Sequence, residues 1–98
     1  MREKTTLRVG VLGCGMISAD HFAAWANCQG AEVVAVCDPM ADRAKARAEQ
    51  FGIPAFYDSP EAMMAAESLD LTDIITPRES QAAMVRLAAR HGIHALSE

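Results

Sequence analysis

The segment LRVGVLGCGMIS, residues 7–18, decides the fold of this 98-residue chain. Its first half is a run of apolar and β-branched residues, which is typical of a strand buried on both faces of a sheet. Two glycines, Gly13 and Gly15, follow at once, and an apolar pattern with helical spacing begins near Met16. A strand that passes through a glycine-rich turn directly into a helix predicts the first βα unit of a parallel α/β domain.

The glycine turn has the form G-x-G-x-x-S, from Gly13 to Ser18, and this form suits a bound pyrophosphate. Gly13 allows a tight turn, and Gly15 lacks a Cβ, so a phosphate can approach the backbone. The free N–H groups at the start of the next helix would point at that anion. Ser18 stands where a third glycine is usual, so we expect helix and strand to lie slightly further apart. A plain turn is the alternative interpretation, but the position of the motif favours a dinucleotide site.

The rest of the chain repeats this alternation of strand and helix. The expected strands are 7–12, 32–37, 55–57, 71–75 and 93–96, of which 55–57 is a short edge strand. The expected helices are 16–27, 41–51, a short one capped by Ser59, and 79–91. Because such alternation implies right-handed crossovers, we predict an α/β fold, a doubly wound parallel sheet (Rossmann fold) of about five strands with helices on both faces. We expect residues 1–98 to form a single dinucleotide-binding domain.

Asp38 ends the second predicted strand, 20 residues after Ser18. That spacing suits an acidic residue which accepts hydrogen bonds from an adenosine ribose. A carboxylate there would repel a 2′-phosphate, so NAD is favoured over NADP as the cofactor. The alternative is that Asp38 only caps the next helix, since Pro39 follows it. Arg43 lies one turn further on. It is interpreted as a solvated helix residue, and the alternative is that it weakens the preference for NAD.

Composition narrows the classes of partner. The chain has 9 basic and 13 acidic side chains and a formal net charge of −4, which argues against nucleic acid or an anionic membrane as partner. No apolar run approaches the roughly 18 residues of a membrane span. The 3 scattered cysteines fit a reducing compartment, so we expect a cytoplasmic protein. The 19 alanines predict a thin core with closely packed helices.

The remaining reactive side chains give weaker signals. The histidines and cysteines show no metal-ligand spacing, so no metal site is expected. Cys14 lies beside a helix N-terminus, which favours a thiolate, but a small loop residue is the simpler interpretation. His21 is interpreted as a surface or packing histidine. Asp73 interrupts an apolar run, and because an unpaired buried charge is costly, we expect it near a strand end or hydrogen-bonded.

Four segments carry a family resemblance: VGVLGCGMI at 9–17 with His21 after it, AEVVAVCDP at 31–39, LDLTDIITP at 69–77, and GIHALSE at 92–98. Together they resemble the N-terminal domain of the Gfo/Idh/MocA oxidoreductases, the group of glucose–fructose oxidoreductase and inositol dehydrogenase. The likeness runs over nearly the whole chain, from Leu7 to Glu98. It implies an NAD(P)-dependent oxidoreductase as the parent protein.

The resemblance also implies which residues bind the cofactor. They are Gly13, Gly15, Met16, Ile17, Asp38, Thr76, Pro77 and Glu98. The first four would hold the pyrophosphate, the aspartate the adenosine ribose, and the Thr-Pro pair would line the cleft. The glutamate matches that of the family's Glu-Lys-Pro motif, beside the nicotinamide ribose. The family's usual catalytic residue is the lysine that would come next, so no catalytic residue is expected within the chain.

Two positions depart from the family pattern. Gln81 stands where a histidine is frequent, which affects contacts on the substrate side, and Ile93 stands where lysine is common. Since the chain stops at Glu98, we expect it to be a truncated cofactor domain that lacks the sixth strand and the C-terminal substrate domain. Uncovered apolar surface and a free sheet edge would then favour self-association.

The function expected from the resemblance is the cofactor-binding half of an NAD(H)-dependent oxidoreductase acting on a small, sugar- or polyol-like substrate. The isolated chain is expected to bind NAD without catalysing the reaction. The alternative is a stand-alone dinucleotide-binding sensor or interaction module. A methyltransferase would also place a glycine loop and an acidic strand end against a nucleoside, but the match at Thr76-Pro77 argues against it.

Overall fold

The computed structural model describes residues 6–15 and 18–97. Within them, strands and helices alternate as predicted. The strands are β1 (Leu7–Leu12), β2 (Ala31–Cys37), β3 (Ala55–Tyr57), β4 (Leu71–Ile74) and β5 (His94–Ser97). The helices are α1 (Ser18–Ala26), α2 (Ala41–Phe51), α3 (Pro60–Ala66) and α4 (Arg78–Arg90). The sequence therefore placed every strand to within one residue at each end.

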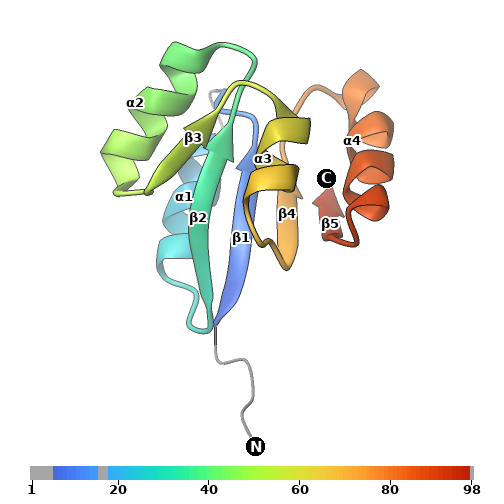
Figure 1. Ribbon diagram of the computed structural model, residues 1–98. Coiled ribbons are helices and arrows are strands. Elements are labelled where there is room, and N and C mark those ends of the chain that lie inside the picture. The colour runs from blue at the N-terminus through green and yellow to red at the C-terminus, as the bar shows by residue number, and fades with distance from the viewer. Residues whose placement is uncertain (1–5, 16–17, 98) are drawn as a thin grey trace, which may run out of the picture.

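All five strands form one parallel sheet in the order β3-β2-β1-β4-β5. The chain runs outward from β1 to β3 and then crosses to β4 on the other side of β1 (Figure 1). The strand order therefore reverses between β1 and β4. Open α/β sheets bind ligands at such a point, at the carboxyl ends of the strands. The predicted doubly wound parallel sheet is confirmed.

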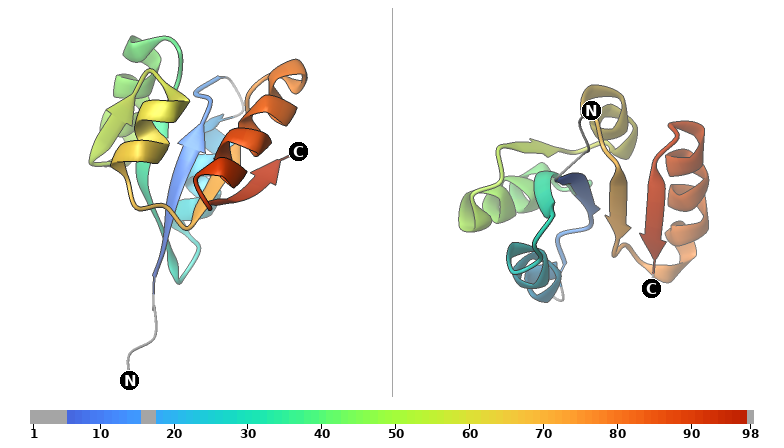
Figure 2. Two further views of the ribbon diagram at one scale, coloured as in Figure 1. Left: turned by 45° about the vertical axis from the view of Figure 1, so that its right-hand side comes forward. Right: turned by 90° about the horizontal axis from the view of Figure 1, so that it is seen from below.

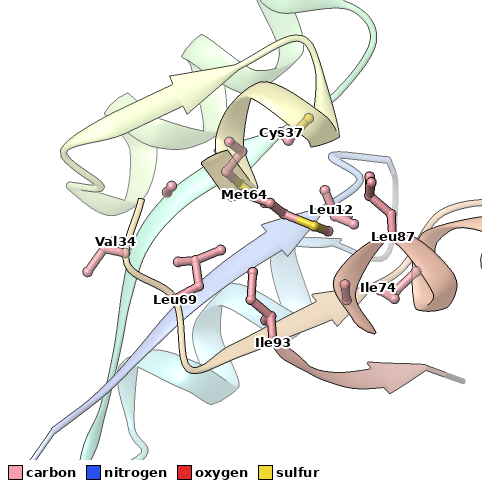
Figure 3. Close-up of a cluster of buried hydrophobic side chains, with 11 residues drawn as sticks. Leu12, Val34, Cys37, Met64, Leu69, Ile74, Leu87 and Ile93 are labelled. Atoms are coloured by element: carbon pink, nitrogen blue, oxygen red, sulfur yellow. The ribbon is translucent and has the colours of Figure 1, made fainter. Parts of the chain in front are cut away.

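Helices cover both faces of the sheet because neighbouring residues of each strand point to opposite sides. On one face, α1 and α2 pack over a cluster centred on Val9, Val11 and Val36. On the other face, α3 and α4 pack over Leu12 and Ile74 (Figure 3). Figure 1 shows α3 in front of the sheet and α1 behind it, and Figure 2 shows α4 lying along β5 at one edge.

The alanines allow close packing, as the composition suggested. Ala44 and Ala48 of α2 and Ala88 of α4 are buried against the strands. The helical spacing of Ala41, Ala44, Ala48 and Phe51 predicts one buried face, but Ala41 is exposed, so the buried face of α2 is narrower than predicted. Phe51 lies at the edge of that stripe and stacks on Phe22 of α1, with ring centroids 5.1 Å apart.

The predicted helix ends are also confirmed. Gly52 follows α2 in the left-handed region, with φ of 67°, and its N–H donates to the Ala48 carbonyl. Ser59 caps α3, since its hydroxyl accepts a hydrogen bond of 3.2 Å from the Ala62 N–H. These ends position the loops that flank β3.

Candidate functional site

The loop after β1 lies against the turn after β4, and Gly13 makes this approach possible. Its φ is +108°, a conformation that side chains of L-residues rarely adopt. A Cβ on Gly13 would stand 2.9 Å from the carbonyl oxygen of Ile75, closer than real Cβ atoms come. The Gly13 N–H also donates to the Cys37 carbonyl at 2.7 Å. Gly13 thus follows β1, bonds the end of β2 and lies close to the turn after β4.

Gly15 serves a different purpose from Gly13. Among the described residues, and apart from its chain neighbours, a Cβ built on Gly15 would meet no atom within 4 Å. The space in front of this backbone is therefore open to a ligand, and any other residue would fill part of it. Met16 and Ile17, the next two predicted site residues, lie outside the described residues, as does Glu98.

A cleft of about 550 Å³ opens at the carboxyl edge of the sheet. Its lining brings together five of the eight residues that the sequence selected. They are Gly13, Gly15, Asp38, Thr76 and Pro77. The cleft lies at the carboxyl ends of β1 and β4, where the strand order reverses, so the fold and the predicted site residues point to the same place.

Asp38 is 5% exposed and connects the glycine loop to the start of α2. Its Oδ2 accepts a hydrogen bond of 2.9 Å from the Cys14 N–H, and its Oδ1 accepts one of 2.8 Å from the Met40 N–H. Met40 is the N-cap of α2 and makes no side-chain cap of its own. The alternative interpretation, that Asp38 only caps the next helix, therefore accounts for Oδ1 but not for Oδ2. Since each oxygen can accept a further hydrogen bond, Asp38 keeps acceptor capacity toward the cleft.

The turn after β4 forms the opposite wall of the cleft. The Thr76 hydroxyl is buried and has no hydrogen-bond partner among the described residues. The Gln81 Nε2 donates to the Thr76 carbonyl at 3.0 Å, and its Oε1 accepts from the Ser97 hydroxyl at 2.8 Å. Gln81 thereby ties this turn to the end of β5. The sequence marked Gln81 only as a departure from a family pattern and did not reveal this link.

Ser18 and Arg47 hold the other end of the glycine loop. Ser18 is fully buried at the start of α1, and its hydroxyl donates to the Gly15 carbonyl at 2.7 Å. The Arg47 Nε donates to the Ser18 hydroxyl at 2.9 Å, and the Arg47 Nη2 donates to the Gly15 carbonyl at 3.2 Å. Arg47 was missed at the sequence level because it is 29 residues from Ser18 and belongs to no local motif.

The two cysteines beside the cleft are held as neutral thiols. Burial of the thiol is the main cause, and the nearby Asp38 carboxylate the second, of a Cys14 pKa raised to about 11. Burial, followed by the charge that Cys14 would carry, raises the pKa of Cys37 to about 12. A thiol that stays protonated near neutral pH is a poor nucleophile. This agrees with the interpretation of Cys14 as a small loop residue.

Asp73 lies on the α1 face of the sheet, outside the cleft, and is 1% exposed. Its Oδ2 accepts a hydrogen bond of 2.8 Å from the Trp25 Nε1 and lies 2.9 Å from the His21 Nδ1. The expectation that Asp73 is hydrogen-bonded is confirmed. These residues line a second cavity, of about 440 Å³, between α1, β4 and β5.

Two classes of site are not found in the described part of the chain. No group of three or more His, Cys, Asp or Glu side chains there could hold a metal ion. No helix among the same residues is long and apolar enough to cross a membrane.

Comparison with known proteins agrees with the fold. A family model described as oxidoreductase family, NAD-binding Rossmann fold, matches residues 7–98. A D-apiose dehydrogenase of Paraburkholderia graminis is 41% identical over 88 residues, which are 90% of this chain and 24% of that protein. An inositol 2-dehydrogenase of Salmonella typhimurium is 37% identical over 79 residues, or 79% of this chain and 24% of that protein.

Solved structures give the same result. The chain superposes with a TM-score of 0.89 and 35% identity on an oxidoreductase from Agrobacterium radiobacter, crystallised in complex with NAD+, L-tartaric acid and magnesium. The match covers 93% of this chain and 27% of that one. The chain thus spans about a quarter of the length of its curated relatives. By its sequence match over residues 7–98 and its fold, the chain belongs to the Gfo/Idh/MocA oxidoreductase family, whose N-terminal region is an NAD-binding Rossmann domain.

Proposed function

We propose that residues 1–98 act as a single dinucleotide-binding domain that holds NAD in the cleft at the carboxyl edge of the sheet. The observation that carries this proposal is the open space in front of Gly15, which lies in the same cleft as the buried Asp38. Gly13 and Gly15, continued by Met16 and Ile17, would bind the pyrophosphate. Asp38 would accept hydrogen bonds from the adenosine ribose.

The opposite wall fits the nicotinamide half of the same molecule. The Thr76 hydroxyl is buried without a partner among the described residues, and burying such a group is costly unless a ligand satisfies it. Thr76 and Pro77 would therefore line the nicotinamide side, with Glu98 beside the nicotinamide ribose. When bound, NAD supplies a carbon that accepts or donates a hydride.

Asp38 supports NAD rather than NADP as the cofactor. Its carboxylate would lie beside the ribose 2′-oxygen, and a phosphate there would meet a like charge. Arg43 also lines the cleft, but its side chain belongs to an exposed position of α2. We therefore expect NADH to bind at least about tenfold more tightly than NADPH, a difference of about 1.4 kcal/mol.

For the whole protein we propose hydride transfer between NAD and a small sugar- or polyol-like substrate. The support is the named activity of the relatives, a D-apiose dehydrogenase and an inositol 2-dehydrogenase. Since the chain covers about a quarter of their length, we propose that it binds the cofactor but does not turn over substrate alone.

Titration of NADH into the purified chain, followed by the fluorescence of the cofactor, tests the proposal. Binding should be saturable, weaker for NADPH, and reduced by adding ADP-ribose as a competitor. Asp38→Ala should weaken this binding. Asp58→Ala, which removes an exposed carboxylate just after β3, is its control for the change in net charge. Absence of NADH binding at millimolar concentration would contradict the proposal for the isolated chain.

We also propose that the isolated chain self-associates. All four residues of β5 are exposed, and Leu96 is 49% exposed on this edge strand. At the other edge, Phe56 of β3 is 44% exposed. Edge strands with exposed apolar side chains are templates for pairing. Sedimentation at rising concentration should show dimers or larger species, and Leu96→Lys should reduce them; a monomer at all concentrations would refute this proposal.

A further inference from the structure

Arg47 reaches from the middle of α2 to the glycine loop with a planar set of donors. Its Nε bonds the Ser18 hydroxyl at 2.9 Å, and its Nη2 bonds the Gly15 carbonyl at 3.2 Å. Its Nη1 bonds the Gln50 Oε1 at 2.7 Å, which fixes the guanidinium from the helix side. Each of its three nitrogens therefore has a protein acceptor.

The Gly15 carbonyl receives three hydrogen bonds. The donors are the Ser18 N–H at 3.1 Å, the Ser18 hydroxyl at 2.7 Å and the Arg47 Nη2 at 3.2 Å. A glycine in a loop has the widest choice of backbone conformations, and Gly15 has no side chain of its own to restrict it. The three donors therefore supply the restriction that Gly15 itself cannot.

Ser18 explains why an arginine is suited to this place. It occupies the position where a third glycine is usual, and it is fully buried with its hydroxyl already donating to Gly15. The hydroxyl oxygen still needs a hydrogen-bond donor, because a buried acceptor without a donor destabilises the folded protein. Arg47 satisfies that oxygen and bonds the Gly15 carbonyl with the same guanidinium.

We propose that Arg47 is a positioning residue, which holds the Gly15 end of the loop in the conformation that binds the pyrophosphate. This inference rests on the proposed function, since the benefit to binding requires a dinucleotide in the cleft. Arg47 acts through Ser18 and Gly15, because three of its five N–H donors, one on each nitrogen, are bonded to protein acceptors.

Binding measurements with two ligands separate positioning from mere stability. NADH carries the pyrophosphate, whereas adenosine has the ribose and base alone. Arg47→Met should weaken NADH binding about tenfold, in line with the loss of charge-assisted hydrogen bonds, and leave adenosine binding within about twofold. Arg47→Lys should also weaken NADH binding severalfold, because an ammonium group cannot reproduce the planar contacts.

Lys45→Met is the matched control, since it removes the same charge from an exposed position of α2. It should change NADH affinity by less than about twofold. Unchanged NADH binding in Arg47→Met, or an equal loss of NADH and adenosine binding, would overturn the proposal. Full recovery by lysine would also overturn it, because that result indicates a direct charge contact with phosphate.

Amide hydrogen exchange tests the same inference without any cofactor. The Ser18 N–H, bonded to the Gly15 carbonyl, should lose protection about tenfold in Arg47→Met and keep it in Lys45→Met. If the parent chain fails to bind NADH, the proposed function fails, and the exchange result alone decides whether Arg47 orders the loop. Equal protection in both variants would refute that role.

Discussion

Asp38 and Asp73 are both buried carboxylates on neighbouring parts of one sheet, yet they are held in opposite ways. Asp38 accepts its hydrogen bonds from two backbone N–H groups, those of Cys14 and Met40. Asp73 accepts from two side chains of α1, those of His21 and Trp25, and its Oδ1 has no partner among the described residues. The first lies at the end of its strand, beside the cleft, and the second within its strand, under a helix.

The position of a buried carboxylate in its strand decides what that carboxylate does. A carboxylate at a strand end, anchored by loop backbone, organises a ligand site and can still accept from a ligand. A carboxylate within a strand, anchored by side chains, fastens a helix to the sheet. Loss of Asp73 should therefore reduce stability, whereas loss of Asp38 should chiefly reduce binding.

The largest expected effect is that of Asp73→Ala on stability. The change leaves the Trp25 and His21 nitrogens without their acceptor and creates a cavity, so the free energy of unfolding should fall by about 3 kcal/mol. For a domain of this size that corresponds to a melting temperature roughly 15 °C lower by circular dichroism. Asp73→Asn keeps an acceptor and should cost about 1 kcal/mol. A melting temperature for Asp73→Ala within 3 °C of the parent, on the order of a 0.5 kcal/mol change, would contradict this assignment.

The next effect is that of Asp38→Ala on cofactor binding. The variant loses the proposed ribose acceptor and the bond that holds the Cys14 N–H, so NADH should bind about thirtyfold more weakly, or about 2 kcal/mol. Asp73→Ala, measured well below its melting temperature, should bind NADH within about twofold of the parent. Equal losses of affinity in both variants would remove the distinction between the two aspartates.

A smaller effect is expected from His21→Ala, which removes one of the two side chains that bond Asp73. Because His21 is partly exposed, with 17% side-chain accessibility, the loss should be about 1 kcal/mol in urea denaturation. In a double-mutant cycle with Asp73→Ala, the two changes should couple by about 1 kcal/mol. His94→Ala, at an exposed position of β5, is the control and should be neutral. Additive effects of His21 and Asp73 would show that they act separately.

The smallest effect concerns the thiol next to Asp38. Since the folded chain raises the pKa of Cys14 to about 11 and of Cys37 to about 12, their contribution to stability is present below about pH 9 and is lost as the pH rises toward those values. Asp38→Asn removes a carboxylate that raises the pKa of Cys14, so its thiolate absorbance should develop at lower pH. Asp73→Asn should leave the pH of this thiolate transition unchanged. An equal shift in both variants would contradict the conclusion that the Asp38 charge raises the pKa of Cys14.

Local signals predicted most of the fold. Hydrophobic runs such as residues 7–12 located the strands, and Gly52 and Ser59 located helix ends, because strand burial and helix capping depend on residues close in the chain. The strand–glycine–helix order also predicted the cleft, since the carboxyl ends of parallel strands meet at one edge. These features need no knowledge of distant contacts.

The features that escaped prediction depend on distant partners. Asp73 was expected to be hydrogen-bonded, but its donors on α1 are 48 and 52 residues away, so their identity required the packed helix. Arg47 carries no sequence signal for the loop that it contacts. Gln81 looked like a missing histidine, whereas its amide joins two segments that only the sheet brings together. Side-chain bonds across elements follow from the tertiary arrangement rather than from spacing.

The Gln81 side chain also connects the edge of the sheet to the cleft. Within the described residues, β5 is paired with a strand on one side alone, as is β3 at the other edge. Two hydrogen bonds, of 2.8 and 3.0 Å, connect Ser97 on the edge strand to the Thr76 carbonyl in the cleft wall. Neither bond lies in the buried core, so the end of β5 and one wall of the cleft share a single side-chain bridge near the surface.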